Sequence, residues 1–206
     1  VSYCLRGVSM AQSLREQKKQ QVRENIVAAA TALLKSKGLE GFSANDIALK
    51  AGVGRATFFR YFESKEAALV SGFYEDQLSA MVKALELAPA ELSPVDTIIW
   101  LFQLLEQSQG PDDLEILKQG TLLRSFPSLR AKAMEFQIGY ESAVSDAIAH
   151  RFNNLCENDI RPGLLATAAL SVVRSVIDQW IDQGAEGNVQ DMLGEALEYL
   201  KAGFPA

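Results

Sequence analysis

The chain has 206 residues, a net charge of −6 and few strand-forming segments, which together predict an all-α protein of one large or two small domains. Its two cysteines, Cys4 and Cys156, indicate no disulfide framework, and no uncharged apolar run reaches the roughly 18 residues of a membrane span. A signal-peptide pattern is also absent, so we expect a reduced, cytoplasmic protein with no membrane partner.

The charge is divided unevenly along the chain. Residues 1–75 hold 11 Lys and Arg against 7 Asp and Glu, a balance of +4, whereas residues 76–206 hold 9 against 19, a balance of −10. A basic N-terminal third beside an acidic remainder is typical of a DNA-binding head on a body that does not touch DNA. The alternative is chance variation between solvated faces.

Residues 1–16 are predicted to form a flexible N-terminal extension. The first residue is Val1 and Met10 lies just downstream, so we expect the natural start to be either Met10 or a valine codon. The basic run from Arg15 to Arg23 suits contact with DNA phosphates, but it equally suits the solvated start of a helix.

The first strong helix is predicted from Gln17 to Ser36, ended by Gly38. Its apolar residues recur at helical spacing and form one stripe: Val22, Ile26, Ala29, Ala30, Leu33 and Leu34. We expect this stripe to pack behind the next two helices. The small core would be completed by Leu39, Phe42, Ile47, Ala48, Val53 and Phe58.

Residues 38–69, GLEGFSANDIALKAGVGRATFFRYFESKEAAL, predict two short helices joined by a tight turn, with a third helix directly after. Ser43 and Asp46 have nearly the spacing and chemistry of a capping box. Gly52 can end the first helix in the left-handed conformation, and Ser64 can cap the third. A helix, a glycine-containing turn and a second helix are the signature of a DNA-binding helix-turn-helix. The three helices are predicted at 44–51, 55–62 and 64–87.

The second of these helices has two chemically different faces. At about 100° per residue, one face groups Phe58, Tyr61 and Phe62. The opposite face groups Arg55, Ala56, Phe59 and Arg60. Arginine reads guanine edges or grips phosphate, and an aromatic or small side chain contacts thymine methyl groups, so the second face suits DNA recognition. The alternative is an ordinary solvated helix with exposed arginines.

The segments KSKGLEGFS, DIALKAGV and ATFFRYFESKEAAL match one family pattern in a single register over about 45 residues. On these residues the chain resembles the tetracycline-repressor (TetR) family of transcriptional regulators. The resemblance implies a three-helix helix-turn-helix domain at 17–63 and a helical effector-binding and dimerisation domain at 64–206. It also implies a sequence-specific homodimeric repressor that binds a palindromic double-stranded DNA operator and is released by a ligand.

The resemblance further implies roles for individual residues of the head. The candidates for contact with base edges are Arg55, Ala56 and Arg60. The candidates for contact with phosphates are Ser43, Thr57, Tyr61 and Lys65. Phe59 departs from the family pattern because it stands where a tyrosine is usual, which leaves stacking or a thymine-methyl contact. Asn45 stands where a longer basic side chain is common, and it reads adenine or makes no contact.

Proline and glycine residues divide the rest of the chain into helices. The helix 64–87 belongs to both domains, and the resemblance makes it the lever that carries the ligand state to the head. Further helices are predicted at 94–109, 112–125, 128–155, 162–183 and 189–202, with Ser128 as the N-cap of the helix at 128–155.

The last two helices carry a wide apolar surface. In 162–183 the apolar residues cover more than one face, so this helix must be covered on two sides. Pairing with a symmetry mate would make a four-helix bundle, as in TetR-like dimers; the alternative is a core helix buried within one chain. The predicted dimer interface comprises Leu165, Ala169, Val173, Ile177, Trp180, Val189, Leu193 and Leu197.

An enzyme finds little support in the sequence. His150 is the single histidine, so a His-based metal cluster is impossible and a Ser/His/Asp triad would rest on that residue alone. No phosphate-binding or dinucleotide-binding glycine motif occurs. The acids Asp112, Asp113 and Glu115 stand at a helix start, where the helix dipole favours them. We predict no catalytic residue, no metal and no cofactor.

A ligand pocket in the C-terminal domain is implied by the resemblance. The stretches RSFPSLRAKAMEFQIGYESAVSDAIAHRF and RPGLLATAAL resemble the C-terminal domain of a TetR subgroup linked to acyl-CoA-like or redox-cofactor-related effectors. We therefore expect a small apolar or amphipathic effector. The candidate lining residues are Trp100, Leu104, Leu123, Phe126, Met134, Phe136, Gln137, Tyr140 and Trp180. The competing interpretations are a helical ligand-binding or protein-interaction module without DNA regulation, and a helical enzyme that depends on His150.

Overall fold

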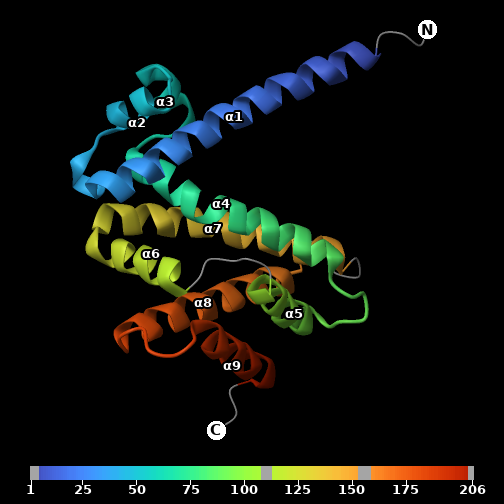
Figure 1. Ribbon diagram of the computed structural model, residues 1–206. Coiled ribbons are helices and arrows are strands. Elements are labelled where there is room, and N and C mark those ends of the chain that lie inside the picture. The colour runs from blue at the N-terminus through green and yellow to red at the C-terminus, as the bar shows by residue number, and fades with distance from the viewer. Residues whose placement is uncertain (1–4, 108–112, 153–158, 204–206) are drawn as a thin grey trace. The chain divides into compact units, whose positions relative to one another are not determined.

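The computed structural model describes residues 5–107, 113–152 and 159–203, and within these ranges it contains helices and no strand (Figure 1). The predicted all-α fold is therefore confirmed. The elements in chain order are α1 (Leu5–Lys37), the 3-10 helix η1 (Leu39–Gly41), α2 (Ala44–Lys50), α3 (Arg55–Tyr61), α4 (Lys65–Leu87), α5 (Pro94–Gln107), α6 (Asp113–Ser125), α7 (Pro127–Arg151), α8 (Arg161–Asp182) and α9 (Val189–Ala202).

The chain divides into two compact units, which we call the head, Val1–Gly72, and the body, Phe73–Ala206. Helix α4 runs from one into the other without a break. The start of α4 belongs to the head because Leu69 is fully buried and Arg23 of α1 donates a hydrogen bond to Ser71 Oγ at 3.1 Å. The head therefore extends past the boundary expected after residue 63.

Helix α1 begins at Leu5, well before the expected start at Gln17. The stretch 11–24 consists mainly of Ala, Gln, Arg, Glu and Lys, which are good helix formers, and this preference continues the helix toward the N-terminus. Residues 5–16 are therefore helical where a flexible extension was expected. The side chains from Leu14 to Gln21 are exposed, so this part of α1 is helical without being packed in the head core.

The head core forms where the apolar stripe of α1 meets α2 and α3. Ile26 and Ala30 of α1 are fully buried, as are Ile47 of α2 and Phe58 of α3. Most of the expected core residues are confirmed, but Val22 and Leu34 of α1 and Val53, in the turn between α2 and α3, are only partly buried. Buried alongside them are Leu39, Phe42, Ala48 and Phe62.

Helix α7 starts one residue earlier than expected and uses a different cap. It begins at Pro127, and its N-cap is Phe126 in an extended conformation, so Ser128 is not the cap that the sequence suggested. Proline suits the first helical position because its fixed φ matches the helix and its missing N–H would have had no intrahelical partner there.

The body core is contributed by five helices. Its largest cluster of buried residues joins α4, α5, α7, α8 and α9, and fully buried members include Leu85, Leu101, Ile148 and Leu197. A second cluster joins α8 and α9 through Val176, Trp180, Val189 and Leu193, with apolar residues of α6 packed against it.

Much of the wide apolar surface of α8 is covered within the chain, although Leu164 is 61% exposed. One side of α8 packs on α7, another on α9, and α6 covers part of the remainder. By length and composition alone α8 is apolar enough to cross a membrane, but Ala169, Val176 and Trp180 are buried in the body. Coverage by α6, α7 and α9 matches the alternative that the sequence left open, a core helix buried within one chain, and pairing with a second copy stays a prediction.

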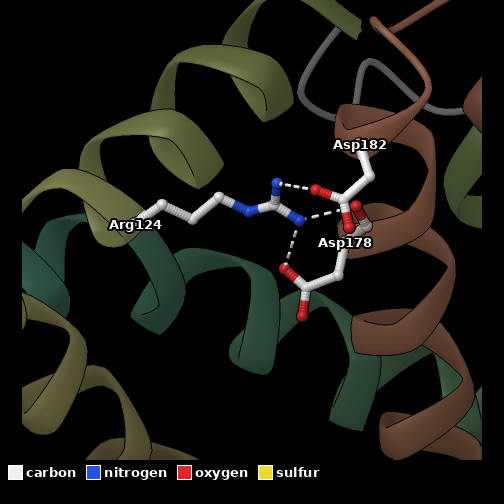
Figure 2. Close-up of polar contacts among 3 residues, drawn as sticks. All are labelled: Arg124, Asp178 and Asp182. Atoms are coloured by element: carbon white, nitrogen blue, oxygen red, sulfur yellow. Dashed lines mark hydrogen bonds and ion pairs between the residues drawn. The ribbon is translucent and has the colours of Figure 1, made fainter.

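At its C-terminal end helix α6 makes polar contacts to α8, in addition to the apolar packing of Ile116 and Leu117 (Figure 2). None of its residues, all of which the structure describes, is buried. Arg124 Nη1 donates to Asp182 Oδ1 at 2.6 Å, and Arg124 Nη2 donates to Asp178 Oδ1 at 3.0 Å. The two aspartates lie one turn apart on α8, so a single guanidinium of α6 bridges consecutive turns of its neighbour.

Candidate nucleic-acid interface

The start of α2 is fixed by a capping box. Ser43 Oγ accepts a hydrogen bond from Asp46 N at 3.3 Å, and Asp46 Oδ2 accepts one from Ser43 N at 2.8 Å. These bonds satisfy backbone donors that the first helical turn leaves without partners. The hydrogen bond between the Ser43 and Asp46 side chains holds the pKa of the Asp46 carboxyl below its usual value. Ser43 and Asn45 are both exposed at this helix start.

The turn between α2 and α3 depends on Gly52. Its φ is +68°, in the left-handed region that side chains with a Cβ rarely adopt. The backbone then closes through Val53 N, which donates to Ala48 O at 2.9 Å. The turn connects α2 to α3, and one face of α3 lies outside the core.

Helix α3 presents the face that the sequence predicted. Phe58 is fully buried and Phe62 is 4% exposed, so they anchor the helix to the head. Thr57 and Tyr61 are partly buried. The residues predicted to contact bases all lie on the exposed side, together with the aromatic residue that departs from the family pattern: Arg55, Ala56, Phe59 and Arg60.

Two arginine–aromatic pairs lie on α3. The Arg55 guanidinium carbon lies 5.4 Å from the Phe59 ring centroid, and that of Arg60 lies 5.6 Å from the Tyr61 ring centroid. Phe59 also meets the buried Phe58 edge to face, with ring centroids 5.2 Å apart. Planar guanidinium groups attract the negative faces of aromatic rings, so these contacts restrict where the arginines point.

Lys65 has partners that the sequence did not reveal. Its Nζ donates to Leu39 O at 2.7 Å and to Phe42 O at 3.1 Å, and it lies 5.3 Å from the Phe42 ring centroid. It thereby ties the start of α4 to the segment that leads into α2. An ammonium group has three N–H donors, so one remains for the predicted phosphate contact.

A shallow open depression lies between α1 and the end of α3. Tyr61 borders it on the α3 side, and the α1 side is lined by Glu16, Gln17, Lys19, Gln20, Gln21, Arg23 and Glu24. The sequence indicated the basic run of α1 but not that Tyr61 of α3 lies beside it. Arg23 is placed by the head itself, because its guanidinium carbon lies 4.4 Å from the Phe62 ring centroid. The depression therefore brings basic residues of α1 beside a predicted phosphate contact.

The predicted ligand-lining residues of the body separate into several environments. Phe136 stacks on Tyr74 of α4 with centroids 5.8 Å apart, and Tyr140 Oη donates to Met81 Sδ at 2.7 Å. Trp100 and Leu104 pack against the same cluster.

The other predicted lining residues lie elsewhere. Leu123, Phe126 and Gln137 are partly buried, and Met134 is 58% exposed. Trp180 is buried in the second cluster, where its Nε1 donates to Gly187 O. The structure thus groups Trp100, Leu104, Phe136 and Tyr140 and separates the others.

Most of the predicted dimer-interface residues are used within one chain. Ala169, Trp180, Val189, Leu193 and Leu197 are each at most 5% exposed in the single chain. Their side chains are therefore not available to a partner subunit, because neighbouring helices of the same body cover them. Leu165, Val173 and Ile177 are partly exposed. Ile177 faces α6, where its Cγ2 would lie 3.9 Å from a Cβ placed on Gly120.

Comparison with known proteins matches both units. Residues 26–70 match the family described as bacterial regulatory proteins, tetR family, and residues 102–205 match the MftR C-terminal domain. The chain is 23% identical over 175 residues to the proposed mycofactocin biosynthesis transcriptional regulator MftR of Mycobacterium tuberculosis, covering 85% of this chain and 87% of that protein.

The descriptions of two further relatives mention fatty acid metabolism or a fatty acyl-CoA. The chain is 26% identical over 189 residues to the fatty acid metabolism regulator protein of Bacillus subtilis, covering 87% of this chain and 93% of that protein. Among solved structures, Thermus thermophilus FadR, a TetR-family transcriptional repressor in complex with lauroyl-CoA, aligns with a TM-score of 0.60 at 23% identity, covering 89% of this chain and 95% of FadR. At that identity the structural likeness supports the fold alone.

Proposed function

Because the chain belongs to the TetR family of transcriptional regulators, we propose that it is a homodimeric repressor that binds a palindromic operator and leaves it when an amphipathic ligand binds the body. Such a regulator works in the cytoplasm, where its operator lies. The first part of the proposal concerns the head, and the second concerns the body, so the two can be tested separately.

The exposed face of α3 is the single observation that carries DNA binding. Two arginines and an aromatic ring project from a helix whose opposite side is buried in the head. A helix of this kind inserts into the major groove, where arginine donates two hydrogen bonds to guanine and apolar side chains contact the methyl group of thymine. The capping box at α2 supports the same interpretation, because it holds Ser43 and Asn45 at an exposed helix start, where phosphate oxygens can approach.

A palindromic operator has two-fold symmetry, so a protein that binds it as proposed would be a symmetric dimer. Two heads of a symmetric dimer reach half-sites about 34 Å apart, which is one helical turn of DNA. We place the partner contact on the part of α8 and α9 that the chain leaves uncovered. Large apolar side chains on that surface include Leu164, which is 61% exposed, and Tyr199, which is 47% exposed.

An acyl-CoA is the effector class that we propose for the body. The aromatic and apolar cluster around Tyr74, Phe136 and Tyr140 suits an acyl chain, and it includes residues of α4, the helix that continues into the head. The names of two relatives, a fatty acid metabolism regulator and a FadR bound to lauroyl-CoA, support this class. Helix α4 would then carry the ligand state to the head.

DNA binding is tested by selecting sites from a random duplex pool with the purified full chain, followed by gel shifts at several salt concentrations. We expect one palindromic sequence to be enriched, and specific binding to weaken as salt rises because phosphate contacts release counterions. Recovery of no common sequence, with only salt-sensitive binding to any DNA, would contradict a sequence-specific regulator.

The effector is tested on the selected operator with lauroyl-CoA, with coenzyme A and free laurate as matched controls. A coupling free energy of about 1–3 kcal/mol is typical of allosteric proteins, so we expect lauroyl-CoA to weaken operator binding by about 5- to 150-fold. Equal effects of lauroyl-CoA and coenzyme A would exclude a role for the acyl chain, and no effect of either would exclude this effector class.

A further inference from the structure

Phe59 is an exposed aromatic ring in the middle of a face that otherwise carries charge. It is 44% exposed, and its neighbours on the outer side of α3 are Arg55, Ala56 and Arg60. The ring is not required by the head core, which Phe58 and Phe62 already fill from the other side of the helix. Part of this apolar ring therefore remains open to a partner outside the chain.

The ring is held in a defined orientation. Its edge-to-face contact with Phe58 has an interplanar angle of 88°, and Phe58 is itself fully buried and fixed by the core. The guanidinium carbon of Arg55 lies over the same ring, 5.4 Å from its centroid. Arg55 and Phe59 stand one helical turn apart, so they form one continuous element whose base is anchored in the head.

The chemistry of the two side chains selects what each can recognise in a major groove. A phenylalanine ring has no donor or acceptor, and the apolar group that bases present in this groove is the C5 methyl of thymine. Arginine donates two parallel hydrogen bonds to O6 and N7 of guanine. Stacking on the ring reduces the number of directions in which the Arg55 fork can point.

We propose that Arg55 and Phe59 act as one reading element, in which Phe59 packs on a thymine methyl group while Arg55 contacts a guanine close to that thymine. The inference rests on the proposed DNA-binding function and specifies what this face recognises. Phe59 is then a specificity-determining residue, whereas a tyrosine at the same place would offer a hydroxyl to a phosphate.

The spacing of the pair limits where the two bases lie. Residues four apart on a helix are separated by about 6 Å along its axis, and stacked base pairs by about 3.4 Å. The guanine and the thymine are therefore expected within about two base pairs of each other in each half-site. A sensitive thymine farther from the guanine would not fit a single reading element.

The test removes the methyl group from DNA instead of altering the protein. In the selected operator, each thymine is replaced in turn by uracil, which differs only by the missing methyl, and binding of the wild-type full chain is measured. Burying one such group corresponds to a factor of about four in affinity. We expect one thymine in each half-site to show this loss, within two base pairs of the guanine whose replacement is harmful in wild-type protein but not in Arg55→Ala.

The assignment to Phe59 is tested by repeating the scan with Phe59→Ala and Phe59→Leu. We expect uracil to have no further effect on Phe59→Ala and a smaller effect on Phe59→Leu, which keeps an apolar side chain. Leu49→Ala is the matched control, because Leu49 is an exposed apolar residue of α2, 82% exposed and outside α3. It should show the wild-type pattern, and thermal melting confirms that each variant is folded.

The results separate this inference from the proposed function. A selected operator with no methyl-sensitive thymine, or the same uracil effect in wild type and Phe59→Ala, overturns the reading element while leaving DNA binding intact. Failure to select any operator overturns the regulator itself. If Phe59→Ala binds the operator normally but loses a protein partner, the ring is a protein-docking residue and the inference is wrong.

Discussion

Arg124 contacts Asp178 twice: its Nη2 donates to the main-chain oxygen of Asp178 at 2.6 Å and to the carboxylate at 3.0 Å. With the additional bond to Asp182, this guanidinium connects the end of α6 to two turns of α8 (Figure 2). The hydrogen bond to the Asp178 carboxylate is the largest cause of the raised pKa of Arg124. Since α6 has no fully buried residue, these polar contacts add to the packing of its partly buried Ile116 and Leu117.

Arg124→Ala should loosen α6. The side chains of Arg124, Asp178 and Asp182 are all partly exposed, and exposed ion pairs contribute little individually. We therefore expect a loss of about 1 kcal/mol in the free energy of unfolding. The effect should shrink at high salt, which screens exposed charges. Urea denaturation at low and high salt measures it. Arg130→Ala, an exposed arginine of α7, is the control, and an equal loss there would show that α6 attachment is not involved.

Lys65→Met should destabilise the head. The methionine keeps most of the apolar stem but cannot donate the hydrogen bonds to Leu39 O and Phe42 O. A hydrogen bond to a charged group contributes about 1.5–3 kcal/mol to stability. We expect a loss of about 2 kcal/mol in urea denaturation. Lys83→Met, at an exposed position of α4 in the body, is the control and should leave stability nearly unchanged.

The same variant tests the predicted phosphate contact of Lys65. If the third N–H reaches a phosphate, the slope of log affinity against log salt should become shallower by about one. An unchanged slope with lowered stability would make Lys65 a positioning residue that acts only through the segment before α2.

Tyr74 and Tyr140 should make the body sensitive to alkaline pH. Burial, with a smaller effect from the Asp178 charge, raises the pKa of Tyr74 to about 12, and burial also raises the pKa of Tyr140 above its ordinary value of 10.0. The unfolded chain ionises these groups near pH 10 while the folded chain keeps them protonated. Stability is therefore complete below pH 10 and falls as pH rises through about 12.

Denaturation curves between pH 8 and about pH 12 check this prediction. Tyr74→Phe and Tyr140→Phe should each flatten the alkaline loss of stability. At neutral pH, Tyr140→Phe should cost about 1 kcal/mol because the Met81 contact is lost. An alkaline slope identical to that of the wild type in both variants would show that these tyrosines ionise equally in the folded and unfolded chain.

Gly72→Ala and Gly120→Ala should have different effects on stability although both glycines lie in helices. A Cβ on Gly72 would lie 2.7 Å from Val27 Cγ1, and valine is stiff about χ1, so the helices must move apart. A Cβ on Gly120 would overlap Ile181 Cδ1, the end of a side chain that can rotate away.

We expect Gly72→Ala to lower stability by about 1 kcal/mol despite the better helix propensity of alanine, and Gly120→Ala to be neutral or slightly stabilising. Thermal melting compares the two variants. Val27→Ala should restore part of the loss in Gly72→Ala. Absence of such rescue would mean that crowding against Val27 is not the cause.

Arg55→Ala and Arg60→Ala should change operator preference. Each good bidentate arginine–guanine pair contributes about 1–3 kcal/mol of discrimination, so each variant should relax one position of the half-site. Repeating the site selection with each variant measures this. A uniform loss across all sequences would instead assign that arginine to phosphates.

The helix-turn-helix of the head was readable from the sequence because each of its signals is local. The Ser43–Asp46 capping box, the left-handed Gly52 and the two faces of α3 depend on residues within about one turn of each other, and the structure confirms all three. Local capping and turn signals also predicted the approximate ends of most helices. They failed at the start of α7, where Ser128 was expected to be the N-cap but Pro127 takes the first helical position.

The packing partners were decided only by the tertiary structure. The apolar width of α8 required coverage on two sides, but periodicity is the same whether α6, α7 and α9 or a second chain provides that coverage. Likewise, the sequence did not reveal that Lys65 donates hydrogen bonds to the main-chain oxygens of Leu39 and Phe42. Nor did it reveal that Arg124 binds two carboxylates of α8. Such contacts join residues far apart in the chain, and a charged side chain in a sequence carries no mark of which distant group will satisfy it.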